Sequence, residues 1–137
     1  KMANRTFFDV QSSNREVKII ATKVKIGTEP AATAVLTDAS GTDIATNGID
    51  SVVWGDATGG SGADDKFKIT LKDKYEALLS VHATKGNDAG GFTPASVQEI
   101  SEDVATNKTI TFDLDGNLSS SDEFYVTMFL LNSSVTR

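Results

Sequence analysis

The chain has 137 residues, a formal net charge of −6 and no cysteine. A chain of this length fits one domain and can bury about 68% of its unfolded surface, which is enough for a core without disulfides. The absence of cysteine excludes a disulfide framework and a thiolate metal site. The basic residues are scattered and form no phosphate-binding stripe, so we expect no nucleic-acid partner.

No stretch of the sequence approaches the roughly 20 apolar residues of a membrane span, and the amino-terminal residues lack the apolar core of a signal peptide. We therefore expect a protein that is made in the cytoplasm and has no membrane partner. Met2 resembles a natural start, whereas nothing in the pattern explains Lys1 before it.

Residues 1–13 show no sustained hydrophobic period, so we expect an extended N-terminal arm followed by a single β domain over residues 14–137. Phe7 and Phe8 are the only apolar anchor of this arm. Paired aromatic side chains outside a strand either fold back on their own domain or bind a neighbouring subunit, and the sequence leaves both alternatives open. Phe7 and Phe8 are therefore candidate partner contacts.

The rest of the chain is a series of short apolar segments separated by turn residues. Many of them alternate apolar and polar residues with the period of two that turns one face of a strand toward a core. Asn47–Gly48 predicts a hairpin between about Ile44 and Trp54, and residues 55–65 and 86–93 predict surface loops. The expected strands are 17–26, 32–37, 49–54, 67–71, 79–84, 97–100, 109–114 and 124–131.

The strands 67–71 and 79–84 are expected to lie side by side, because Asp73–Lys74 interrupts the alternation between them. Residues 73–80 could form one short helical turn, and no longer segment has helical spacing. About seven to eight short strands predict an all-β, single-domain antiparallel β-sandwich or small barrel.

Residues that could carry chemistry are few. His82 is the only histidine and is expected at the surface, because zinc requires several converging ligands. Ser80 shares its face, but no strained nucleophile turn surrounds it, so we expect no enzyme and no cofactor. Asp113 and Asp115 precede Gly116 with the wrong spacing for a calcium loop, and a hairpin turn is favoured.

The glycine-rich loop contains three acidic residues, Asp56, Asp64 and Asp65. A bound cation is one interpretation, and a solvated loop is the favoured one. Trp54, Tyr75 and Tyr125 raise a carbohydrate-binding module as an alternative, since flat aromatic faces stack on sugar rings. Their apolar neighbours favour a place in the core or at its rim.

The strand 124–131 is apolar on both faces. Val126, Met128 and Leu130 alternate there with Tyr125, Phe129 and Leu131. A strand of this kind is buried on both sides, so we expect a second subunit or a shell to cover one face. Val126, Met128 and Leu130 are the candidate contacts of this homo-oligomer or shell interface.

Three segments resemble a known family in their order along the chain. A short polar arm precedes Arg15-Glu16-Val17-Lys18, and a glycine-rich stretch precedes the segment Leu-Lys-Asp-Lys-Tyr-Glu-Ala-Leu-Leu at 71–79. This order is similar to that of small virion structural proteins of tailed bacteriophages, over roughly the first two thirds of the chain.

The resemblance implies a capsid decoration (cement) protein that binds the major capsid protein and neighbouring virion subunits. It brings no catalytic residue. The acidic net charge favours the outer capsid surface, because packed nucleic acid would repel an acidic lining. The alternative is a carbohydrate-binding or host-adhesion β-sandwich module, including a tail-associated component.

Overall fold

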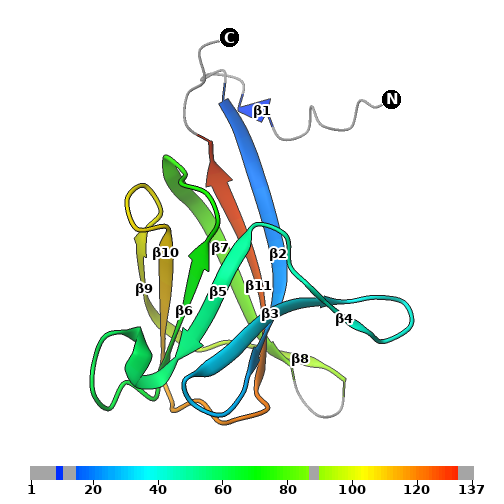
Figure 1. The fold of residues 1–137 in the computed structure, drawn as a ribbon, viewed down its shortest axis with the longest axis vertical. Helices are drawn as coiled ribbons and strands as arrows, with labels where there is room; N and C mark the ends of the chain where they lie inside the picture. Colours follow the sequence, from blue (N-terminus) through cyan, green and yellow to red (C-terminus); the bar gives the residue numbers. More distant parts are fainter. Residues whose placement is uncertain (1–8, 11–14, 87–89, 133–137) are drawn as a thin grey trace.

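The computed structural model describes residues 9–10, 15–86 and 90–132 (Figure 1). Over these residues it contains eleven strands, one 3-10 turn (η2, Gly55–Thr58) and no α-helix. The expectation of an all-β antiparallel fold is confirmed. The strands are β1 (Asp9–Val10), β2 (Arg15–Ile26), β3 (Ala31–Thr37), β4 (Asp43–Ala45), β5 (Ile49–Trp54), β6 (Lys66–Leu71), β7 (Ala77–Gly86), β8 (Phe92–Pro94), β9 (Val97–Asp103), β10 (Thr109–Leu114) and β11 (Glu123–Leu131).

The strands form one curled sheet, a half-barrel, in place of the two layers of the expected sandwich (Figure 1). The strand order is β8-β7-β11-β2-β3-β5-β6-β10-β9, and β1 and β4 pair with β2 and β3 off this path. The strand number also exceeds the expected seven to eight. The additions are the short strands β1, β4 and β8, of which β1 falls inside the expected arm and β8 overlaps the expected loop 86–93.

The expected pairing of the strands around Phe67 and Val81 is wrong. β6 pairs with β5 and β10, whereas β7 pairs with β11 and β8. The connection between β6 and β7 does not turn back or form a helical turn. It runs from one part of the curled sheet to another. Two backbone hydrogen bonds hold it there: the amide of Lys72 donates to the Gly48 carbonyl (2.9 Å), and the amide of Tyr75 donates to the Val104 carbonyl (3.0 Å).

The core fills the concave side of the sheet. Alternate residues of β6 and β10 are buried, as their period of two predicts. Phe67 of β6 stacks on Phe112 of β10 with ring centroids 4.6 Å apart and on Phe124 of β11 at 5.3 Å. Since β6 and β11 are not neighbours in the strand order, this contact shows that the curl brings distant strands together.

Asn47–Gly48 does not form the expected hairpin turn. β4 pairs with β3, and the chain then continues past Gly48 as β5, which pairs with β3 and β6. Gly48 has a φ of +94°, and a Cβ there would lie 3.1 Å from Cδ1 of Ile20. The Asn47–Gly48 pair therefore joins β4 to β5, and both of these strands pair with β3. The reversal occurs before β4, where Asp38 accepts hydrogen bonds from the amides of Ser40 and Thr42, both at 2.9 Å.

An ion pair lies beside the turn of the β3–β4 hairpin, where Thr37 is opposite Asp43. Lys25 Nζ lies 2.7 Å from a carboxylate oxygen of Asp43, and the Thr37 hydroxyl donates to the other oxygen at 2.9 Å. These hydrogen bonds, that from Lys25 first, lower the pKa of Asp43 below its ordinary value, and the pKa of Lys25 is raised mainly by the same bond.

We predict that Asp43→Asn lowers the melting temperature slightly near neutral pH and has less effect in acid. A carboxyl with a depressed pKa in the folded state contributes stability above its unfolded pKa and loses it as the pH falls through the folded pKa. The difference between wild type and variant should therefore shrink below about pH 4. Melting curves at several pH values would measure it, and a difference that grows in acid would contradict the prediction.

Candidate interaction surface

β11 directs its two apolar faces to opposite sides of the sheet. Val126, Met128 and Leu130 are 1%, 0% and 0% exposed and belong to the core of this chain. These candidate contacts therefore cannot reach a partner in this fold, and the prediction chose the wrong face. The opposite face of β11 is available to a partner. It carries Tyr125, Thr127, Phe129 and Leu131, which are half-buried.

The convex side of β2 and β11 presents a largely apolar row of side chains. The register pairs Val17 with Leu131, Ile19 with Phe129 and Ala21 with Thr127, so these side chains share one face. Ile19 is 37% exposed. We call this set the outer stripe; it comprises Val17, Ile19, Ala21, Tyr125, Thr127, Phe129 and Leu131.

Further exposed aromatic and aliphatic residues lie on β8 and on the β3–β4 hairpin. Phe92 of β8 is 62% exposed and meets the Tyr125 ring edge-to-face, with centroids 4.8 Å apart. Leu36 and Ile44 pair across the β3–β4 hairpin, which projects from the half-barrel, and are 48% and 52% exposed (Figure 1). A shallow groove of about 310 Å³ separates Leu36 and Thr37 from Tyr125.

The aromatic residues that suggested sugar binding lie in different environments. Trp54 and Tyr75 are 7% and 2% exposed, and the Trp54 indole N–H donates to the Gly27 carbonyl at 3.1 Å. Their assignment to the core is confirmed. Tyr125 lies on the convex face with Phe92. Phe92 stands among glycines and polar residues that are typical of a loop, so no sequence signal indicated its place on this surface.

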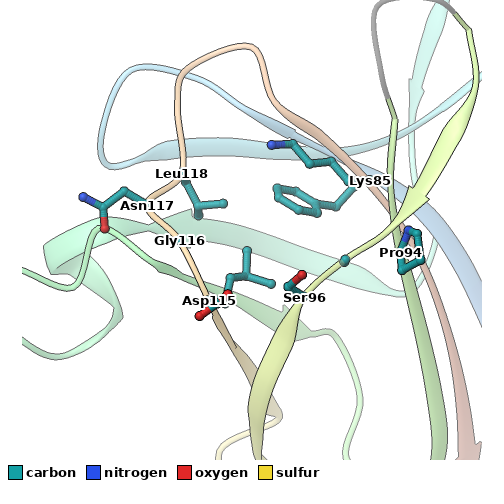
Figure 2. Close-up of a pocket in the computed structure, with 10 residues that line it drawn as sticks. Lys85, Pro94, Ser96, Asp115, Gly116, Asn117 and Leu118 are labelled. Carbon is teal, nitrogen blue, oxygen red and sulfur yellow. The ribbon is translucent and has the colours of Figure 1, made fainter.

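A second hollow lies where the β8–β9 link meets the loop between β10 and β11 (Figure 2). Its volume of about 230 Å³ is below the roughly 300–1,000 Å³ of typical ligand sites. Lys85 Nζ lies 3.6 Å from Asp122, and Asp115 accepts a hydrogen bond from Gln98 at 2.9 Å. These charged groups therefore have partners among the side chains of the protein.

The loop after β10 is not the expected hairpin turn. β10 pairs with β6 and β9, whereas β11 pairs with β2 and β7, so residues 115–122 cross between two parts of the sheet. Asp113 lies 3.6 Å from Lys66, and Asp115 bonds to Gln98. The two carboxylates therefore pair with side chains of neighbouring strands.

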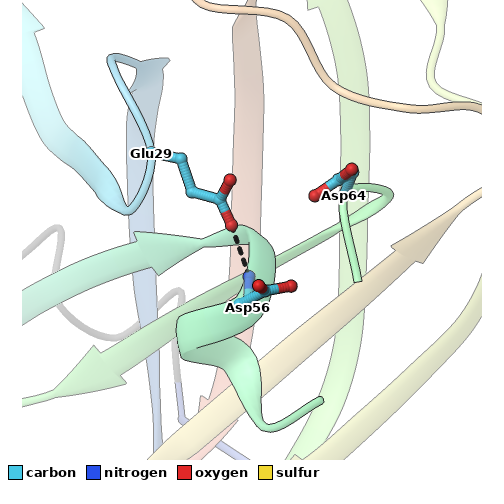
Figure 3. Close-up of side chains that lie close together, drawn as sticks. All are labelled: Glu29, Asp56 and Asp64. Atoms are coloured by element: carbon cyan, nitrogen blue, oxygen red, sulfur yellow. Dashed lines mark hydrogen bonds between the residues drawn. The ribbon is translucent and has the colours of Figure 1, made fainter. Parts of the chain in front are cut away.

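Glu29, Asp56 and Asp64 form an acidic group whose nearest oxygens lie within 4.8 Å of one another (Figure 3). Two of the three carboxylates hold the loop that carries η2. Glu29 accepts a hydrogen bond from the Asp56 amide at 2.6 Å, and Asp56 accepts one from the Gly62 amide at 2.6 Å. None of the three is buried. Backbone support accounts for Glu29 and Asp56, and Asp65 is not a member of the group.

Gly55 is required beneath this acidic group. Its φ is +73°, and a Cβ there would overlap the Glu29 carboxylate. We predict that Gly55→Ala lowers the free energy of unfolding by about 1–2 kcal/mol, since the left-handed conformation alone costs that much for a residue with a Cβ. Chemical denaturation would measure it. Gly60→Ala is the control, because Gly60 has neither a left-handed φ nor an atom near its Cβ position. Equal losses in the two variants would contradict the prediction.

The remaining candidates are surface residues or lie beyond the described part. His82 is exposed on the convex face opposite Thr127, which confirms its expected surface position, and Ser80 is exposed on the same strand. Phe7 and Phe8 lie outside the described residues. In the part of the chain that the structure describes, no helix is long and apolar enough to cross a membrane.

These features define an all-β, single-sheet domain with the outer stripe on its convex side. No family model, curated protein or solved structure matches the chain.

Proposed function

We propose that this chain is a non-enzymatic structural protein of a tailed-phage virion, a capsid decoration protein that binds the assembled shell. The outer stripe is the observation that carries the proposal. Its members come from two central strands and form one surface, in contrast to the scattered apolar residues found on most soluble domains. The order of the segments around Arg15 and Tyr75, similar to that of phage virion proteins, supports the same assignment.

A decoration protein needs only modest affinity at each contact. A standard interface covers about 800 Å² on each partner, and contacts repeated across a lattice multiply weak binding. The outer stripe would supply the apolar centre of such a contact. Lys23, at the margin of the stripe, would form part of its polar rim. The partners would be the major capsid protein and neighbouring copies of this chain. The net charge of −6 favours the outer surface of the particle over the genome-facing one.

The proposal is tested by adding purified protein to assembled phage capsids that lack it. Saturable binding followed by ordered density on the shell in cryo-electron microscopy would support it. Density that places β2 and β11 against the capsid would further support the outer stripe as the contact. If no shell binds the protein at concentrations of tens of micromolar, the decoration role is wrong.

A second candidate function rests on Tyr125 and Phe92. This pair of an exposed Phe92 and a half-buried Tyr125 is the described feature that best suits stacking on a sugar ring, as in a host-adhesion or tail-associated module. A glycan array with the wild type and Phe92→Ala would test it. Binding that disappears in the variant would favour this function, and an array without any signal would count against it.

A further inference from the structure

The Asn47–Gly48 pair lies in the turn from Thr46 to Ile49 that joins β4 to β5. Asn47 is exposed, whereas Gly48 is buried. The turn is closed by the Ile49 amide, which donates to the Thr46 carbonyl at 3.5 Å. Ordinary N–H···O hydrogen bonds measure about 2.7–3.2 Å, so this one is weak. The turn can therefore open locally at little cost in free energy.

Glycine is required after Asn47. Gly48 has a φ of +94°, and a Cβ at this position would lie 3.1 Å from Cδ1 of Ile20. A residue without a side chain also leaves its own backbone nitrogen sterically open to its neighbours. The Asn47 carboxamide is therefore next to an unhindered peptide nitrogen.

The Asn47 carboxamide and the Gly48 amide make no hydrogen bond with another residue of the described part. A cation lies close to them, because Lys18 Nζ is 4.0 Å from the position that a Cβ of residue 48 would take. A positive charge at this distance stabilises the negative charge that develops when a peptide nitrogen loses its proton and attacks a carbonyl group.

We propose that Asn47 is a site of spontaneous deamidation in the folded protein. The Gly48 nitrogen forms a bond to Cγ of Asn47, the bond from Cγ to Nδ2 breaks, and a succinimide ring results. The proton lost by the Gly48 amide balances the proton that the leaving group takes up as ammonia. Water then opens the ring at one of its two carbonyl groups, which leaves either aspartate or isoaspartate at residue 47. Water is the only co-reactant, and the assignment is independent of the proposed function.

Isoaspartate would lengthen the main chain between two backbone anchors. On one side of the pair the Thr46 amide donates to the Ala34 carbonyl at 3.0 Å, and on the other the Gly48 carbonyl accepts from the Lys72 amide at 2.9 Å. Isoaspartate carries the main chain through its side-chain carbonyl and so adds one carbon atom between these anchors. One of the two hydrogen bonds should then be lost, which couples the modification to the stability of the β4–β5 connection.

Peptide mapping by mass spectrometry tests the site. The purified full chain is kept folded in mildly alkaline buffer, and the deamidated fraction of each asparagine is followed over time. Asn47 should react at least about tenfold faster than Asn117, which is also exposed but precedes the bulky Leu118. Asn117 is thus an internal control in every sample. Equal rates at Asn47 and Asn117, or no reaction at Asn47, would overturn the proposal.

A pair of lysine variants tests the part assigned to Lys18. Lys18→Met removes the ammonium group and keeps a long side chain, so the rate at Asn47 should fall about threefold or more. Lys68→Met removes the same charge from β6 and should leave the rate unchanged. Circular dichroism should show the native fold in both variants. If the two variants react equally fast at Asn47, the assistance by Lys18 is wrong.

Thermal melting separates the effect of the altered main chain from that of the added charge. Asn47→Asp carries the charge of the product on an unaltered main chain and should melt within about 1 °C of the wild type. Aged protein enriched in isoaspartate should melt about 2–4 °C lower, because it loses a backbone hydrogen bond. An aged sample that melts like Asn47→Asp would overturn the predicted loss at the β4–β5 connection.

Discussion

Replacement of Phe67 by alanine is expected to lower the free energy of unfolding by about 3–5 kcal/mol. Phe67 is 0% exposed and its ring stacks on both Phe112 and Phe124. Phe112 lies on β10, which pairs with β6, and Phe124 lies on β11, which pairs with β2 and β7 instead. The lost ring would therefore leave a cavity between the β6–β10 pair and β11. Domains of this size are stable by only about 5–15 kcal/mol, so this loss is a large share of the total and would leave a domain at the lower end of that range only marginally stable.

Urea denaturation followed by tryptophan fluorescence would measure the effect, since Trp54 is buried. Phe92→Ala is the matched control, because it removes the same ring from a residue that is 62% exposed. In the wild type this ring meets the Tyr125 ring edge-to-face. Its loss should be well below that of Phe67→Ala. A loss under about 1 kcal/mol for Phe67→Ala would mean that the core does not depend on this stack.

The second large effect concerns binding. If the outer stripe contacts the shell, Phe129→Lys should weaken binding to assembled capsids by about 100-fold, because it places a charge at the centre of an apolar contact and removes an aromatic anchor. Phe129 lies on the convex face opposite Ile19, so the substitution leaves the core residues of β11 untouched.

Ser101→Lys provides the control for charge. Ser101 is exposed on β9, at the end of the strand order, and the substitution changes the net charge by the same amount. Circular dichroism should show the native fold in both variants. Unchanged binding by Phe129→Lys would remove the outer stripe from the proposed interface, whereas loss of binding in both variants would assign the effect to charge.

The sequence predicted best where a strand has one apolar face. In β6, Phe67, Ile69 and Leu71 alternate with polar residues, and all three are 0% exposed. β11 has two apolar faces, so its period could not show that Met128 points inward and Phe129 outward. That choice is made by the register with β2, in which Phe129 lies opposite the exposed Ile19.

Local sequence patterns could not predict which distant segments pair with each other. Asp73–Lys74 and Asn47–Gly48 both favour chain reversal, yet each lies where the chain moves on to another part of the sheet. The backbone of Lys72 and Gly48 bonds together instead, across more than twenty residues of sequence. Local turn preference is weak compared with the burial gained by closing the curl.

The position of β11 has a consequence for synthesis. β11 lies between β7 and β2 and is the last of the described strands to leave the ribosome. Until it emerges, β2 and β7 each lack their shared neighbour and present apolar edges, which are prone to association with other chains. Nascent chains of this protein should therefore depend on chaperones until Leu131 has emerged from the ribosome, and chaperone binding to stalled chains of increasing length would locate that point.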